Sequence, residues 1–112
     1  MENIVEVLHY VTPSGKDAFD SWLTRLVDPR TQARIATRID RLAAGNFGDC
    51  KSLREGVYEL RIDWGPGYRV YYGILGRARI LLLCGGDKRK QSSDIERAIK
   101  YLRDYKERIL IE

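Results

Sequence analysis

The fold is decided by the stretch YELRIDWGPGYRVYYG, residues 58–73 of a chain of 112 residues. Apolar and polar side chains alternate on both sides of the Gly65-Pro66-Gly67 tripeptide, and a period of two is typical of strands. Glycine and proline in this combination favour a tight turn. The stretch therefore predicts two strands joined at a turn, although Glu59, Arg61 and Arg69 place charges in the middle of it.

One face of this hairpin collects the charges. Successive side chains of a strand point to opposite faces, so the parity of the residue number assigns the face. The apolar set is Tyr58, Leu60, Ile62, Val70, Tyr72 and Ile74. The opposite set is Glu59, Arg61, Arg69 and Tyr71. If the apolar set packs against helices, we expect the second set to share an exposed face, either as solvated cross-strand ion pairs or as an anion-binding surface.

The N-terminal part of the chain predicts a strand and a first helix. The β-branched stretch IVEVLHYV, residues 4–11, is typical of a strand and contains the single histidine, His9. Ser14, followed three residues later by Asp17, resembles a capping box at a helix start. The helix that follows has an apolar stripe at helical spacing, consisting of Phe19, Trp22, Leu23 and Leu26.

A second helix follows directly. Asp28 is its expected N-cap, and Pro29 suits the first turn, where its missing N–H costs nothing. Its inner stripe is Ile35, Ile39, Leu42 and Ala43, and Gly45-Asn46 ends it. Arginines recur along one side of this helix, at Arg30, Arg34, Arg38 and Arg41. Such a row is usually a solvated face, and it is also a candidate contact for RNA backbone or an acidic partner.

The C-terminal half predicts mostly sheet and one further helix. A short polar segment at residues 49–53 is a weak candidate for an edge strand. The stretch RILLLC, residues 79–84, is apolar throughout, which suits a strand covered on both faces. A last helix is predicted from Ser93, with Glu96 completing a capping box, to Arg108. Its inner face is Ile95, Ile99, Leu102 and Tyr105.

These elements define the fold class. The order is strand, two helices, three closely spaced strands and a final helix, all within one domain spanning residues 1–112. This order predicts an α+β fold in which an N-terminal strand and a helical hairpin pack on a small, mainly antiparallel sheet, with a C-terminal helix.

Composition narrows the classes of function. Lys and Arg total 20 against 16 Asp and Glu, a net charge of +4 that is compatible with binding RNA, DNA or an acidic protein. One histidine excludes a two-histidine nuclease and argues against a zinc site. Cys50 and Cys84 have no CxxC spacing, and Cys84 is expected to be buried and inert. Neither a signal peptide nor a membrane-spanning stretch is evident, so we expect a cytoplasmic protein.

The glycine-rich loop GGDKRKQSS, residues 85–93, follows the apolar strand and is strongly basic. We expect Lys88, Arg89 and Lys90 to lie near the end of the charged face of the hairpin. Guanidinium and ammonium groups there would suit a phosphodiester, and a tyrosine could stack on an unpaired base. Other motifs are absent: GPGYRV lacks the third glycine of a dinucleotide-binding turn, and the chain has no P-loop and no Ser-His-Asp or Cys-His set.

The sequences GVYELRIDWGPGYRVYY and ILLLCGGDKRKQSSDIERA, with the preceding helix pair, resemble addiction-module killer proteins. These are HigB-like toxins of the RelE/ParE superfamily, from bacterial type II toxin–antitoxin systems, and the resemblance covers nearly the whole chain. It implies a toxin neutralised by a cognate helix-turn-helix antitoxin. Many such toxins cleave mRNA on the ribosome by attack of a ribose 2′-OH on the adjacent phosphate, and they need no metal or other cofactor.

The resemblance also implies roles for individual residues. Arg69 matches the arginine that contacts the scissile phosphate in the nuclease branch, Arg61 falls where that branch has a strand lysine, and Lys88 falls in its basic loop. The expected RNA contacts are Tyr71, Arg89, Lys90, Gln91, Arg34 and Arg38. No metal ligands are expected.

The chain departs from the nuclease pattern where protons would be transferred. Glu59 stands where that branch has a lysine, Ile95 where it has a tyrosine, and the histidines of the ribosome-dependent HigB enzymes are absent. One hypothesis makes Glu59 the general base while Arg61, Arg69 and Lys88 stabilise the phosphorane. The alternative is that Glu59 only holds the arginines in place. Two other functions stay open, a ParE-like toxin that inhibits DNA gyrase by binding and a degraded toxin that only binds its antitoxin.

Overall fold

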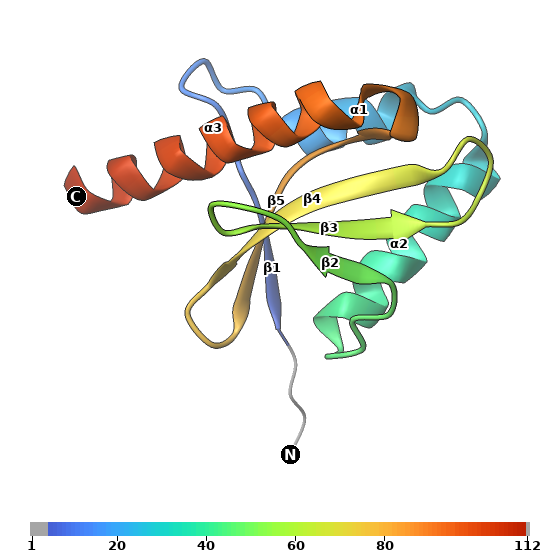
Figure 1. The fold of residues 1–112 in the computed structure, drawn as a ribbon, viewed down its shortest axis with the longest axis horizontal. Helices are drawn as coiled ribbons and strands as arrows, with labels where there is room; N and C mark the ends of the chain where they lie inside the picture. Colours follow the sequence, from blue (N-terminus) through green and yellow to red (C-terminus); the bar gives the residue numbers. More distant parts are fainter. Residues whose placement is uncertain (1–4, 112) are drawn as a thin grey trace.

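A computed structural model describes residues 5–111 of the protein (Figure 1). In chain order the elements are β1 (Glu6–His9), α1 (Ala18–Arg25), α2 (Pro29–Ala43), β2 (Cys50–Ser52), β3 (Val57–Ile62), β4 (Tyr68–Leu75), β5 (Arg79–Asp87), the 3-10 helix η1 (Lys88–Lys90) and α3 (Gln91–Ile111). The strands form one sheet in the order β1-β5-β4-β3-β2. β1 runs parallel to β5, and the other neighbouring pairs are antiparallel. The predicted α+β class and mainly antiparallel sheet are confirmed.

The N-terminal helices begin where a carboxylate caps them. Asp28 accepts a hydrogen bond from the backbone N–H of Arg30, so the predicted start of α2 is confirmed. The predicted cap of α1 at Ser14 is wrong, because α1 begins at Ala18 and Asp17 is its N-cap. An isolated bridge between Val11 and Asp17 holds the intervening residues in a turn. Ile4, included in the predicted first strand, lies outside the described residues.

The C-terminal helix is longer than its predicted range of 93–108. It begins at Gln91, directly after η1, and extends to Ile111. Asp87 caps η1 by accepting a hydrogen bond from the Arg89 amide, so the predicted capping box at Ser93 is wrong. Glu96 instead forms an ion pair with Arg54. None of the helices within residues 5–111 is both long enough and apolar enough to span a bilayer.

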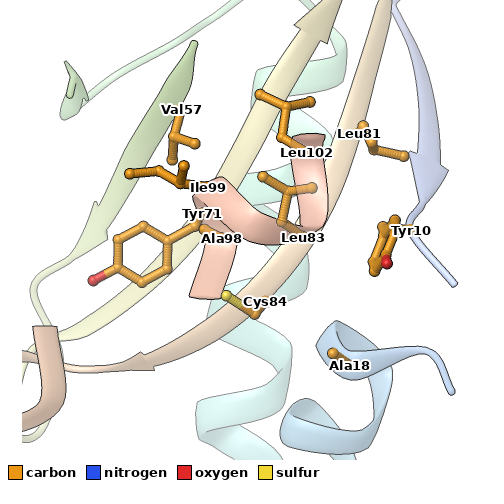
Figure 2. Close-up of a cluster of buried hydrophobic side chains, with 10 residues drawn as sticks. All are labelled: Tyr10, Ala18, Val57, Tyr71, Leu81, Leu83, Cys84, Ala98, Ile99 and Leu102. Atoms are coloured by element: carbon orange, nitrogen blue, oxygen red, sulfur yellow. The ribbon is translucent and has the colours of Figure 1, made fainter. Parts of the chain in front are cut away.

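The sheet has a hydrophobic cluster on each face, so the molecule has three layers. α1 and α2 cover one face, where Phe19, Ile35 and Leu42 pack on Leu60, Ile62, Val70, Tyr72, Ile80 and Leu82. α3 covers the other face, where Ala98, Ile99 and Leu102 pack on Val57, Tyr71, Leu81, Leu83 and Cys84 (Figures 1 and 2). The expectation that the face carrying Glu59 is exposed is therefore wrong: the apolar stripe of α3 needs a partner, and this face supplies it.

A β-bulge in β5 determines which residues of that strand lie beside Arg69 of β4. Tyr71 pairs with Cys84 and Tyr72 with Leu82, so Leu83 is the extra residue in β5. Leu83 and Cys84 consequently both lie in the cluster beneath α3. Beyond the bulge, Gly86 pairs with Arg69. The bulge thus places a residue without a side chain beside Arg69, under the start of α3.

Candidate functional site

The carboxylate of Glu59 lies inside the protein and joins three elements. The residue is 1% exposed. Its Oε2 atom, on β3, lies 3.3 Å from Nε of Arg69 on β4. The same oxygen accepts a hydrogen bond of 2.7 Å from Nε2 of Gln91, the first residue of α3. The other oxygen, Oε1, is buried and has no hydrogen-bond partner within residues 5–111. Glu59 therefore fixes Arg69 relative to the start of α3.

Tyr71 and Asp94 extend this buried polar cluster. Tyr71 is fully buried in the cluster that also holds Val57 and Ile99 (Figure 2). Burial raises the pKa of Tyr71, and the nearby carboxylates of Glu59 and Asp94 raise it further. Its hydroxyl has no hydrogen-bond partner in the described part of the chain. The ring has no open face on which a base could stack, so the structure gives no support to Tyr71 as an RNA contact.

Asp94 is a buried carboxylate that the sequence analysis missed. It is 5% exposed, and burial raises its pKa although Arg97 forms an ion pair with it. Its Oδ2 atom lies against Gly86, where any added Cβ would overlap it. Asp94, Ala98 and Leu102 recur at a spacing of four along the buried side of α3. That spacing is the signal that could have found Asp94.

At the surface, Arg69 and Lys88 meet beside the hairpin turn. A Cβ added to Gly67 would lie 3.8 Å from Nη1 of Arg69 and 3.6 Å from Cδ of Lys88. The backbone N–H of Lys88 donates to the carbonyl oxygen of Gly67 at 3.1 Å. Gly67 has φ +84°, which favours glycine over residues with a Cβ. The side chain of Arg69 is 15% exposed, so two cations flank this turn while Glu59 holds one of them from below.

The other predicted catalytic cation points elsewhere. Arg61 is the cross-strand partner of Arg69, but its Nη2 atom pairs with Oδ1 of Asp49 at 2.9 Å. Glu59 therefore holds Arg69 and not Arg61. Arg89 pairs with Asp87 at 2.8 Å, and that contact lowers the pKa of Asp87.

The prediction of a loop at residues 85–93 is wrong, because these residues form the end of β5, the helix η1 and the start of α3. Two cations of η1 have no close carboxylate. Lys88 and Lys90 are exposed. Across residues 5–111, the ion pairs within 4 Å involve neither of these lysines. We name Arg69, Lys88, Arg89 and Lys90 the turn patch. It offers an anion one guanidinium that is paired with a buried carboxylate and three exposed cations.

Arg34 and Arg38 lie on α2, which covers the opposite face of the sheet from Glu59. The guanidinium of Arg34 stacks 3.8 Å from the ring centre of Trp64, the residue just before the hairpin turn. Both arginines line a groove of about 380 Å³ beside α2. The structure therefore separates these two predicted RNA contacts from the turn patch by the hairpin itself.

Comparisons with known proteins identify one relative. No family model matches the chain. A Haemophilus influenzae protein named "Uncharacterized protein" is 54% identical over 80 residues, which cover 71% of this chain and 81% of that protein.

In the described part of this chain, histidine, cysteine and carboxylate side chains do not gather in groups of three that could hold a metal ion.

Proposed function

We propose that this chain, which belongs to the same family as the Haemophilus influenzae protein, is the toxin of a type II toxin–antitoxin module and cleaves mRNA on the ribosome. In this proposal it acts in the cytoplasm, and a helix-turn-helix antitoxin neutralises it. The observation that supports the proposal best is the turn patch: Arg69 and Lys88 both lie against Gly67, and Arg69 forms an ion pair with a buried carboxylate.

The proposed reaction is attack of a ribose 2′-OH on the adjacent phosphate, which expels the 5′ oxygen and leaves a cyclic phosphate. Negative charge develops on the phosphate oxygens as the phosphorane forms. Arg69 would donate from its guanidinium to these oxygens, and Lys88 would stabilise the same charge as a second cation. Arg89 and Lys90 would contact neighbouring phosphates, and Arg61 would extend the surface along β3.

Glu59 has a positioning role in this proposal. A general base must come within hydrogen-bond reach of the hydroxyl that it deprotonates. Glu59 is 1% exposed and already accepts from Gln91 and faces Arg69, which leaves no path for a ribose hydroxyl. Its negative charge would instead keep the guanidinium of Arg69 oriented toward the substrate. The proton of the 2′-OH then leaves to water or to a group of the ribosome, and the departing 5′ oxygen takes up a proton from water.

Primer extension on a reporter mRNA in a translating bacterial extract tests this function. We expect new 5′ ends inside the reading frame with the wild-type protein, dependent on translation, and their loss with Arg69→Ala. Arg77→Ala is the matched control, because Arg77 is an exposed arginine at the far end of β4. An intact message with wild-type protein would refute the nuclease.

A ParE-like inhibitor of DNA gyrase is the second candidate. The burial of Glu59 favours it, since a toxin that acts by binding needs no accessible base. Supercoiling of a relaxed plasmid by gyrase, measured with and without the protein, distinguishes the two. Inhibition of gyrase together with an intact mRNA would support this candidate.

A further inference from the structure

A second cationic surface lies beside α2. The groove of about 380 Å³ is lined by Ala33, Arg34, Thr37, Arg38, Arg41, Ile62 and Asp63. Its three arginines follow one another at i, i+4 and i+7, which places the first and last about 10 Å apart along the helix axis. We name these residues the α2 groove.

The arginines of the α2 groove lack the carboxylate partners that most other arginines have. Arg30, Arg54, Arg61, Arg69, Arg89, Arg97, Arg103 and Arg108 each form an ion pair. Within residues 5–111, no carboxylate lies within 4 Å of the guanidinium nitrogens of Arg34, Arg38 or Arg41. The charge gathered here is therefore available to an external anion.

Packing holds two of these guanidinium groups in place. Arg34 stacks on Trp64, whose indole N–H in turn donates to the buried Thr31 hydroxyl at 2.9 Å. The guanidinium of Arg38 lies against Gly48, so that a Cβ added there would be 2.6 Å from its Nη1. Nη2 of Arg38 is buried and has no hydrogen-bond partner within residues 5–111.

A neighbouring apolar feature favours a polypeptide over a nucleic acid as the occupant of this groove. Asp63, in the wall of the groove, could accept a hydrogen bond from a peptide N–H. Across the loop that carries Gly48 lies an apolar hollow of about 270 Å³, lined by Phe47, Cys50, Ser52, Tyr58, Tyr72 and Ile74. Phe47 and Ile74 are 47% and 41% exposed. A phosphodiester backbone has no apolar group for this hollow, whereas a peptide side chain would fill it.

We propose that the α2 groove binds an extended, acidic segment of a partner protein. Carboxylates two residues apart in such a segment lie on the same side at about 6.6 Å, a separation that neighbouring arginines in the row Arg34, Arg38 and Arg41 can match, so that each arginine would contact a carboxylate. An apolar side chain of the segment would enter the hollow beside Phe47. This inference does not rest on the nuclease proposal, because the groove lies on the α2 side of the hairpin, away from Glu59.

Titration of the whole protein with an acetylated, amidated hexapeptide of alternating Leu and Glu tests the proposal. The indole N–H signal of Trp64 and the backbone amide of Thr37 are followed by NMR at physiological salt. We expect saturable shifts of both signals. In Arg34→Gln/Arg41→Gln the affinity should fall about tenfold, since two charge-assisted contacts are lost. The matched control is Arg77→Gln/Arg79→Gln, which removes the same charge from the β4–β5 turn and the first residue of β5 and should bind as the wild type does.

Other outcomes would overturn the proposal. An absence of saturable shifts, or an equal loss of affinity in both double variants, would show that the groove is not a specific peptide site. Saturable binding of a hexauridylate RNA without binding of the peptide would identify it as a nucleic-acid surface. If the groove variant does not fold, Arg41→Gln replaces it, and its expected loss of affinity is about threefold. Unchanged cleavage of mRNA by these variants would separate the two proposals.

Discussion

At the scale of single residues, the most consequential position is Glu59. Its carboxylate is buried between the sheet and α3, and it is paired with Arg69 and Gln91. A buried charge is tolerated only where partners replace the water that it has lost. The charged residues of the hairpin therefore form two different ion pairs. Glu59 and Arg69 form a pair in the interior, and Arg61 forms a pair with Asp49 nearer the surface.

Glu59→Gln should destabilise the fold more than Asp49→Asn. The first change leaves the guanidinium of Arg69, which is 15% exposed, without its counter-charge, and we expect a loss of about 2 kcal/mol in the free energy of unfolding. The second change breaks an exposed pair and should cost at most about 0.5 kcal/mol. Urea unfolding of the two variants measures both values. Equal losses would mean that burial of Glu59 adds nothing to its pairing with Arg69.

Asp94 should make the fold less stable as the pH rises. Burial raises its pKa above the usual 3.8, so the folded protein holds this proton more tightly than the unfolded chain does. The folded state is therefore favoured below pH 3.8, and it loses that advantage as the pH rises from there through the raised pKa. The free energy of unfolding of the wild type minus that of Asp94→Asn should decrease as the pH rises above 3.8. A difference that does not change with pH would contradict this account.

Asp87 supplies the matched comparison, because its pKa is shifted the other way. The hydrogen bond with Arg89 lowers the pKa of Asp87 below 3.8. Its contribution to stability is present above pH 3.8 and is lost as the pH falls through the lowered value. In a pH series extended below pH 3.8, the wild type should therefore lose its advantage over Asp87→Asn. The two aspartates thus give opposite slopes in one protein.

At the scale of elements, glycines in β5 allow helices to approach the sheet on both faces. Gly85 faces α1, and a Cβ there would overlap the indole of Trp22. Gly86 faces α3, and a Cβ there would overlap Asp94. The Gly85-Gly86 pair therefore serves packing in this structure, in addition to leading into the basic helix η1. A strand with a side chain at either position would push one helix away.

Gly85→Ala should cost about 1–3 kcal/mol in the free energy of unfolding, because the new methyl group overpacks the site of Trp22. A double-mutant cycle isolates that contact. In a Trp22→Leu background the same alanine should cost clearly less, since the smaller side chain can move aside. Urea unfolding of the four proteins provides the energies. Additive effects of the two substitutions would show that the strain arises elsewhere.

Local patterns were enough to predict most of the elements, and long-range packing explains the misses. The apolar run of β5 correctly indicated a strand covered on both faces. A strand covered on both faces requires an element packed on the side of the sheet that carries Glu59. The alternation in β3 and β4, by contrast, predicts one buried face and one exposed face. Alternation distinguishes the two sides of a strand, and it does not reveal whether the more polar side is also covered.

The candidate site was predictable only in part, for the same reason. The turn chemistry and the basic residues 88–90 both belong to short stretches, so the proximity of Arg69 and Lys88 could be anticipated. The contact of Glu59 with Gln91 joins residues 32 positions apart and depends on the register of α3. The bulge at Leu83, which decides what lies beside Arg69, leaves no signature that alternation of apolar residues would detect.

At the scale of the whole molecule, the net charge of +4 is not spread evenly. The hairpin tip separates two cationic surfaces, with Gly67, Arg69 and Lys88 on one side and Trp64 with Arg34 on the other. Each has a different chemical character. The turn patch combines an arginine that is paired with a buried carboxylate and exposed lysines, while the α2 groove has an apolar neighbour and a carboxylate in its wall. If both proposals hold, RNA and a protein partner would occupy separate surfaces of this chain.

This division predicts how RNA affinity depends on salt. Each cation that contacts a phosphate of single-stranded RNA releases counterions and adds about 0.7 to the slope of log K against log salt concentration. Arg69→Ala and Lys88→Ala should therefore each reduce the slope by about 0.7. Arg77→Ala removes the same charge at the opposite end of β4 and should leave the slope unchanged, because it contacts no phosphate. Fluorescence anisotropy with a labelled single-stranded RNA, measured over a series of salt concentrations, provides the slopes. Equal reductions in all three variants would mean that the RNA responds only to total charge, and the turn patch would then not be its binding site.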